Sequence, residues 1–191
     1  ADSVAINGNL SVNGTRLEIF NTSSNVFIGE DAGEQISTGS ENVLIGKDAG
    51  DALTTGGQNT AVGRSALGGE TTGAGNVAVG GLAGLFNKGN YNTLLGAQAY
   101  YFSGSGDNNT IIGYNAGGFN TGSANIFIGY QAGQNADGSN LLYIDNSNTE
   151  TPLIHGNFSS NALTINGTLQ MGDNLKLNDQ WLSKDGGDES I

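Results

Sequence analysis

Side chains that could perform acid–base, nucleophilic or metal chemistry are few in this chain of 191 residues. Cysteine is absent, which excludes thiolate nucleophiles, thiolate metal ligands and disulfides together. The single histidine, His155, follows Pro152 in a short predicted strand, and any catalytic triad or histidine-based metal site would have to be built around it. We therefore expect His155 to have a structural or surface role.

Carboxylates are more numerous and gather in two places. Asp185-Gly186-Gly187-Asp188-Glu189 lies near the C-terminus, and the other group is Glu30, Asp31, Glu34, Asp48 and Asp51. Calcium takes about six to eight oxygen ligands, but neither an EF-hand loop nor a Gly-Gly-x-Gly-x-Asp repeat is present. No spacing favours a pair of carboxylates for acid–base catalysis. We therefore predict no catalytic residue, no cofactor and no enzyme, and calcium stays an open alternative.

The charge balance bears on the choice of partner. Lys and Arg number 6 against 18 Asp and Glu, which gives a net charge of −12 at pH 7. Such a charge disfavours binding to the phosphate backbone of nucleic acids. The sequence also has no apolar run of about 18 residues, the length at which a membrane-spanning helix would be considered. We expect no nucleic-acid partner and no membrane insertion.

A repeat dominates the middle of the chain. Each copy has Asn, three mostly apolar residues and Gly, with an Ala three residues after that Gly and a second Gly near the end of the copy. The spacings between successive copies are 17, 17, 17, 16, 17 and 16 residues. The seven copies begin at Asn25, Asn42, Asn59, Asn76, Asn92, Asn109 and Asn125.

One copy predicts one coil of a solenoid. The run after each Asn is short and rich in β-branched residues, and it is bounded by Asn and Gly, which is typical of a short strand. In the first copy, alternation places Val26 and Ile28 on one face and Phe27 on the other. We expect the first two to face inward and Phe27 outward. The predicted fold is all-β, a parallel β-solenoid (β-roll) of about seven 16–17-residue coils with almost no helix.

Residues at one repeat position should stack along the axis. The seven asparagines suit such a ladder, because each amide can bond to the backbone and to the asparagines above and below it. Phe86, Phe102 and Phe119 share another repeat position, and we expect a stacked packing ladder inside the coil or between chains.

Five tyrosines are candidate ligand contacts. Tyr114 and Tyr130 directly follow the strand Gly, where other copies carry charged residues, so this position is expected to be exposed; Tyr91, Tyr100 and Tyr101 lie nearby. Exposed tyrosines can stack on sugars or bind a protein ligand, and ordinary surface or inter-subunit contacts are the alternative. Rows of outward Thr would suggest ice binding. Thr60, Thr93 and Thr110 alternate with Val and Ile, which predicts a buried position instead.

The coils are too slim to supply a self-sufficient core, so we expect the outward apolar row of each chain to pack against two other copies in an intertwined homotrimer. The flanking segments 4–12 and 163–171 resemble each other and contain Asn-Gly, a hairpin signal. The sequence predicts an N-terminal β cap over 1–24, the repeat solenoid over 25–139 and a C-terminal β cap or connector over 140–191.

The repeat also carries a family resemblance. Units such as Asn25-Val26-Phe27-Ile28-Gly29, with Ala32-Gly33, resemble the head repeats of YadA-type trimeric autotransporter adhesins, whose period is shorter. They are even more similar to repeats of phage tail-fibre-like proteins that end in a self-cleaving intramolecular chaperone. Residues 140–191 are similar to segments that follow the repeats in those fibre proteins.

The resemblance implies a homotrimeric fibre that is extracellular, on a cell surface or borne by a virion or injection device. We expect a structural or adhesive segment for attachment or display, with a cell-surface glycan or a protein as receptor. Two other functions stay open: a tailspike-like, polysaccharide-degrading fibre and a purely architectural filament.

Overall fold

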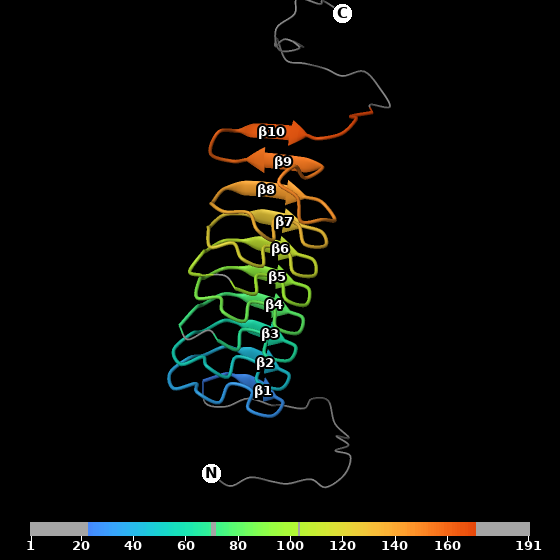
Figure 1. Ribbon diagram of the computed structural model, residues 1–191. Helices are drawn as coiled ribbons and strands as arrows, with labels where there is room; N and C mark the ends of the chain where they lie inside the picture. Colours follow the sequence, from blue (N-terminus) through green and yellow to red (C-terminus); the bar gives the residue numbers. More distant parts are fainter. Residues whose placement is uncertain (1–22, 70–71, 103, 171–191) are drawn as a thin grey trace, which may run out of the picture.

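The computed structural model describes residues 23–69, 72–102 and 104–170, and within them the chain is all-β with no helix. These residues form a rod-shaped parallel β-solenoid of about seven turns, in which one strand of each turn stacks on the next (Figure 1). The predicted all-β parallel solenoid is therefore confirmed. Residues 1–22 and 171–191, which include most of the predicted N-terminal cap and the acidic segment 185–189, lie outside the described residues.

One sheet of ten strands runs along the rod in sequence order. The seven repeats supply β1 (Val26–Ile28), β2 (Val43–Ile45), β3 (Thr60–Val62), β4 (Val77–Val79), β5 (Thr93–Leu95), β6 (Thr110–Ile112) and β7 (Ile126–Ile128). They are followed by β8 (Leu141–Ile144), β9 (Ile154–Asn157) and β10 (Ala162–Ile165).

Strands β1 to β8 pair in parallel, and equivalent repeat positions lie opposite each other, as Phe27 lies opposite Leu44. The parallel register thus extends one strand beyond the seventh repeat. β9 then pairs antiparallel with β8, and β10 antiparallel with β9. The turn of this last hairpin lies at residues 158–161, whereas Asn166-Gly167 follows the end of β10.

The predicted assignment of the two strand faces is wrong. The central residue of each strand points into the coil, and Leu44, Ala61 and Ile111 have no exposed surface. The second and fourth positions of the repeat, such as Val26 and Ile28, lie on the outer face. Both faces of the strand are apolar, so alternation separates them without identifying the inner one. The interior also contains the repeat alanines, fully buried from Ala49 to Ala132.

Each turn has a segment that faces the strand across the interior, and we call it the opposite wall. The size of its inward-facing residue varies with the size of the central strand residue. In several turns this wall carries a Gly, and a Cβ on Gly33 would lie 2.8 Å from the Phe27 ring, so the missing side chain leaves room for that ring. Where the strands supply only Ala61 and Ala78, the wall supplies the fully buried Leu67. In these turns a large residue on one wall is matched by a small one on the other, which keeps the narrow interior filled.

Side-chain amides join the turns. Each repeat Asn is buried, and its Oδ1 accepts a backbone N–H from the next turn at 2.8 to 3.0 Å. Its Nδ2 donates to the carbonyl of the Gly that closes the turn, as Asn42 does to Gly56 at 3.0 Å. The Gly that follows each strand forms the other corner of the turn and has a positive φ, which is 136° at Gly29. A Cβ on Gly29 would lie 2.5 Å from the Gly46 carbonyl oxygen. The predicted Asn ladder is confirmed, and the strand glycines form the corners.

Candidate functional site

An uncharged, mainly aliphatic stripe covers the outer face of the sheet, and we call it the aliphatic stripe. It has two columns that cross all ten strands in the register of the pairing. One column is Val26, Val43, Thr60, Val77, Thr93, Thr110, Ile126, Leu142, Gly156 and Leu163. The other is Ile28, Ile45, Val62, Val79, Leu95, Ile112, Ile128, Ile144, Ile154 and Ile165.

The stripe remains open to solvent in the single chain. Ile28 is 46% exposed and Val79 is 39% exposed. Thr60, Thr93 and Thr110 lie here, half-buried, so the prediction that their position is interior is wrong. Thr93 and Thr110 are adjacent in the column, but the other neighbours of the three threonines are aliphatic, which leaves no regular Thr row of the kind that an ice-binding interpretation requires.

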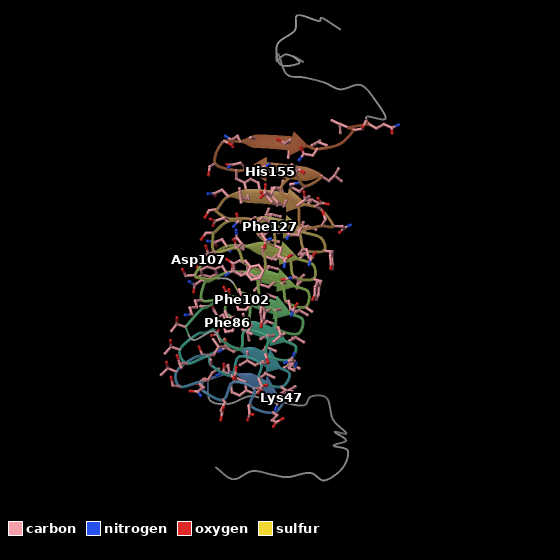
Figure 2. The ribbon with its side chains drawn as sticks, in the orientation of Figure 1. Lys47, Phe86, Phe102, Asp107, Phe127 and His155 are labelled. Carbon is pink, nitrogen blue, oxygen red and sulfur yellow. The ribbon has the colours of Figure 1, made fainter. Side chains whose placement is uncertain are left out.

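Three phenylalanines form an exposed ladder. The ring centroids of Phe86 and Phe102 are 5.4 Å apart at 16°, and those of Phe102 and Phe119 are 5.5 Å apart at 7°. The predicted stacking is confirmed, but the three rings are 41%, 50% and 51% exposed, so they do not pack inside the coil. Figure 2 shows Phe86 and Phe102 one above the other on one side of the rod.

The phenylalanine ladder lies on the wall opposite the aliphatic stripe. Next to Phe86 in this wall, Gly84 faces the interior, because a Cβ there would meet Leu94 of the strand, and Asn87 is fully buried. Phe86, between two inward-facing residues, therefore projects away from the sheet. The rod thus presents an aliphatic surface on one face and an aromatic one on the other.

Tyr101 lies beside this ladder, half-buried. Its ring is edge-on to Phe86 at 5.8 Å and 65°, and to Phe102 at 4.3 Å and 81°. Together with the distance between the two phenylalanines, these values place Tyr101 at the side of the stack rather than above or below it. Tyr101 is thus a component of the aromatic surface.

Three other tyrosines are exposed, as predicted. Tyr114 and Tyr130 stack at 5.7 Å and 12°, and they are 46% and 51% exposed. Because the rings are parallel, each covers one face of the other, which removes half of the stacking surface that a sugar would use. Tyr91 is 65% exposed and leans over Gly75, where a Cβ would be 2.7 Å from its ring.

Tyr100 cannot contact a ligand, so this part of the prediction is wrong. The residue has no exposed surface, and its hydroxyl donates to the Gly122 carbonyl at 3.1 Å and accepts from Nδ2 of Asn109 at 3.0 Å. Burial, with a smaller effect from Asp107, raises the pKa of the phenol far above its ordinary value. Tyr100 occupies the wall position that Leu67 fills two turns earlier, and this shared position is the sequence signal for its burial.

Carboxylates in the first two turns lie on the surface without forming a metal centre. Lys47 pairs with Glu30 at 2.6 Å, and this hydrogen bond raises the pKa of the lysine. Partial burial, followed by the charge of Asp48, raises the pKa of Asp51. Across residues 23–69, 72–102 and 104–170, no three His, Asp or Glu side chains are grouped so that they could hold an ion. Calcium binding remains an untested alternative.

His155 packs near the C-terminal end of the solenoid, where Phe127 and Tyr143 are the last aromatic residues of the interior. It pairs with Tyr143 across β8 and β9, and the two rings meet edge-to-face at 4.8 Å and 89°. The ring of Tyr143 in turn contacts that of the buried Phe127, at a centroid distance of 5.4 Å. Burial, and then Glu150, raise the pKa of Tyr143. These packing contacts support the structural role expected of His155.

A small hollow lies near the same end of the solenoid. It has a volume of about 160 Å³, and it is lined by Asn135, Ala136, Tyr143, Asn148, Thr149 and Glu150. Pockets that enclose small-molecule ligands usually measure about 300 to 1,000 Å³, so this hollow is too small for such a ligand. The extended surfaces of the rod are therefore better candidates for function.

Comparison of the chain with protein-family models, with curated proteins and with solved structures finds no match. No helix long and apolar enough to cross a membrane occurs in the described part of the chain.

Proposed function

We propose that this protein is a structural or adhesive segment of a homotrimeric fibre, used for attachment or display on a virion, a contractile injection device or a bacterial surface. The observation that carries the proposal is the aliphatic stripe. It continues without a charged residue over ten strands, roughly 43 Å at the usual strand spacing. Soluble monomers rarely expose a continuous apolar surface of this length.

The stripe suits association of identical chains about a threefold axis. Its two columns run parallel to the rod axis, so one column can pack against the other column of a neighbouring copy, and three such contacts close a ring. The interface differs from the one predicted from the sequence, because it uses the second and fourth positions of the repeat instead of the third. The predicted β caps would extend this threefold arrangement at the two ends.

The solenoid suits a mechanical role. Backbone hydrogen bonds and the Asn ladder join each turn to the next along the rod. A trimer would place three phenylalanine ladders on its outside and multiply weak contacts into avidity. An extracellular or virion-borne location, and a glycan or protein receptor, belong to this proposal.

Val79→Lys tests the proposed interface. Lysine in the stripe would have to be desolvated on association, which is costly for an unpaired charge. The matched control is Ala97→Lys, because Ala97 is exposed and shares its column with Lys47 and Arg64. By native mass spectrometry, wild type and A97K should have three times the mass of the 19.4 kDa chain, and V79K should be monomeric. A monomeric wild type, or a V79K trimer, would refute the proposed interface.

The tailspike-like alternative makes a different prediction. Incubating the protein with capsular polysaccharide or lipopolysaccharide should release no oligosaccharide if the fibre only attaches or displays. Release of oligosaccharides would favour the degrading fibre over the proposed function. Absence of both cleavage and binding to any cell surface would favour a purely architectural filament.

A further inference from the structure

An Asn-Gly pair lies at the C-terminal end of the solenoid, directly after β10. Asn166 is the one asparagine within residues 23–69, 72–102 and 104–170 that glycine follows. Asn166 and Gly167 are both exposed. Alternation along β10 places Asn166 on the face of Thr164, opposite the aliphatic stripe, so the stripe contact of the proposed trimer leaves it accessible.

Asn166 closes the end of the β9–β10 hairpin that is remote from its turn. Its backbone N–H donates to the Leu153 carbonyl at 2.9 Å, and its Nδ2 donates to the Pro152 carbonyl at 2.7 Å. These two bonds join the residues before β9 to the end of β10, and we call them the Asn166 clamp. Within the described residues β10 pairs with β9 alone, and all its residues are exposed. Local opening of this end therefore costs less than opening the interior.

The Asn-Gly pair is suited to loss of the side-chain amide. The backbone nitrogen of the following residue attacks the side-chain carbonyl carbon, a C–N bond forms, and the amide nitrogen leaves as ammonia. Water then opens the cyclic succinimide to aspartate or isoaspartate, and no other reactant is needed. Gly167 has no side chain to hinder the attack and gives the backbone the widest choice of angles. Its N–H donates no hydrogen bond within the described part of the chain.

The ladder asparagines are protected from the same reaction. Asn109 is 1% exposed, and its Nδ2 and Oδ1 are both bonded. The nitrogen that would attack it belongs to the β-branched Thr110 and donates to the Asn125 carbonyl at 2.8 Å. Every ladder asparagine is followed by Val, Thr or Ile. Exposure, a following glycine and an unbonded attacking nitrogen thus coincide at Asn166.

We propose that Asn166 is a modification site, where spontaneous deamidation releases the end of the β9–β10 hairpin. The product carboxylate has no hydrogen to donate, so the bond to Pro152 is lost and a negative charge faces the Pro152 carbonyl oxygen. Isoaspartate also lengthens the backbone by one methylene group after β10. Because β9 and β10 carry the last residues of the aliphatic stripe, the modification loosens that end of the rod as the protein ages.

Peptide mapping of the full chain after incubation in mildly alkaline buffer tests the reaction. A synthetic peptide of residues 162–170 gives the rate without the fold. Asn166 in the protein should convert at no less than about a tenth of the peptide rate, because its end of the sheet opens easily. Asn109 should stay intact. Mapping also separates Asn166 from the Asn-Gly pairs at 7–8 and 13–14, which lie outside the described residues.

Gly167→Ala is the matched variant that blocks the attack. A Cβ on Gly167 would lie 3.0 Å from Cδ1 of Leu153, the flexible end of a side chain that is 53% exposed, so the variant should fold normally. Deamidation of Asn166 should be at least about tenfold slower in this variant, because alanine restricts the backbone and hinders the ring closure.

Amide hydrogen exchange tests the consequence for the hairpin. Asn166→Asp introduces the product and should speed exchange of the β10 amides about fivefold, as expected for one lost hydrogen bond. Asn161→Asp is the control, because it adds the same charge at the exposed turn of the same hairpin without touching the Asn166 clamp. It should leave the exchange of β10 unchanged.

Three results would overturn the site: Asn166 that stays intact while the peptide converts, conversion of Asn109 as fast as that of Asn166, or unslowed conversion in G167A. Equal exchange of β10 in N166D and N161D would show that the modification does not release the hairpin. Native mass spectrometry of the same samples reports the association of the chains. Failure of this inference is therefore distinguishable from failure of the proposed fibre function.

Discussion

Asn92 lies directly beneath Asn109, and its Oδ1 accepts the backbone N–H of Asn109 at 2.9 Å and Nδ2 of the same residue at 3.0 Å. The Nδ2 of Asn92 donates to the Gly106 carbonyl at 2.9 Å. One buried amide thus satisfies backbone groups in two neighbouring turns. The same residue type at this position in every repeat is explained by the cost of leaving such groups unpaired, about 1 to 3 kcal/mol for each.

The first prediction concerns this ladder. Asn92→Ala leaves a buried N–H and a buried carbonyl without their partner, so the free energy of unfolding should fall by roughly 2 to 5 kcal/mol. Asn135→Ala is the matched control, because Asn135 is exposed, and it should change stability by less than about 0.5 kcal/mol. Denaturant unfolding at one fixed protein concentration measures both. Equal stability of the two variants would show that the ladder does not hold the turns together.

The second prediction concerns the filling of the interior. Leu67 is fully buried in the turn whose strand supplies only Ala61. Leu67→Ala should open a cavity and lower the free energy of unfolding by about 2 to 5 kcal/mol. The same change at Leu153, which is 53% exposed, should have little effect in the same unfolding experiment. If L67A were as stable as L153A, the matching of large and small residues across the interior would be incorrect.

The third prediction concerns pH. Burial raises the pKa of Tyr100 in the folded state, so above pH 10 the unfolded chain loses this proton while the folded chain keeps it. The stability of the wild type should therefore fall as pH rises through this range, whereas Tyr100→Phe lacks this contribution.

At neutral pH, Tyr100→Phe should be the less stable protein by about 1 to 2 kcal/mol, because the hydroxyl bonds to Gly122 and Asn109 are lost. Between pH 9 and 11 this deficit should shrink by about 1.4 kcal/mol. Chemical denaturation at several pH values measures the difference. A deficit that stays constant or widens would mean that the folded protein ionises Tyr100 as readily as the unfolded chain does.

Much of the fold follows from the repeat itself. The interval between asparagines predicts the pairing of strands, and Val26 lies opposite Val43 as that interval requires. The stacking of Phe86, Phe102 and Phe119 follows from the same rule, because residues at one repeat position lie one above another in any solenoid. The strand glycines predict the corners, since their positive φ is unfavourable for other residues.

The inner and outer faces could not be distinguished by alternation, because both are apolar. A signal was nevertheless present, since Thr occurs three times at the second position of the repeat and never at the third. A hydroxyl is easily satisfied at the surface and costly inside a narrow apolar coil. The third position varies from Ala to Phe, as expected of an interior filled jointly by two walls.

The candidate surfaces were only partly predictable. Tyr100 lies near exposed tyrosines in the sequence, yet its repeat position is that of the buried Leu67. The phenylalanine rings are exposed because of the backbone conformation between Gly84 and Asn87. The spacing of the repeats in the sequence does not predict that conformation.

The most direct test of the account measures whether the aliphatic stripe is covered in the native assembly. The chain has no cysteine, so Val79→Cys and Ala97→Cys each introduce a single thiol at a position exposed in one chain. Under native, reducing conditions a maleimide should label A97C quickly and V79C at least about tenfold more slowly, because opening the interface would be needed. After denaturation both should label alike. Equally fast native labelling of V79C and A97C would show that the stripe faces solvent, which contradicts the proposed trimer.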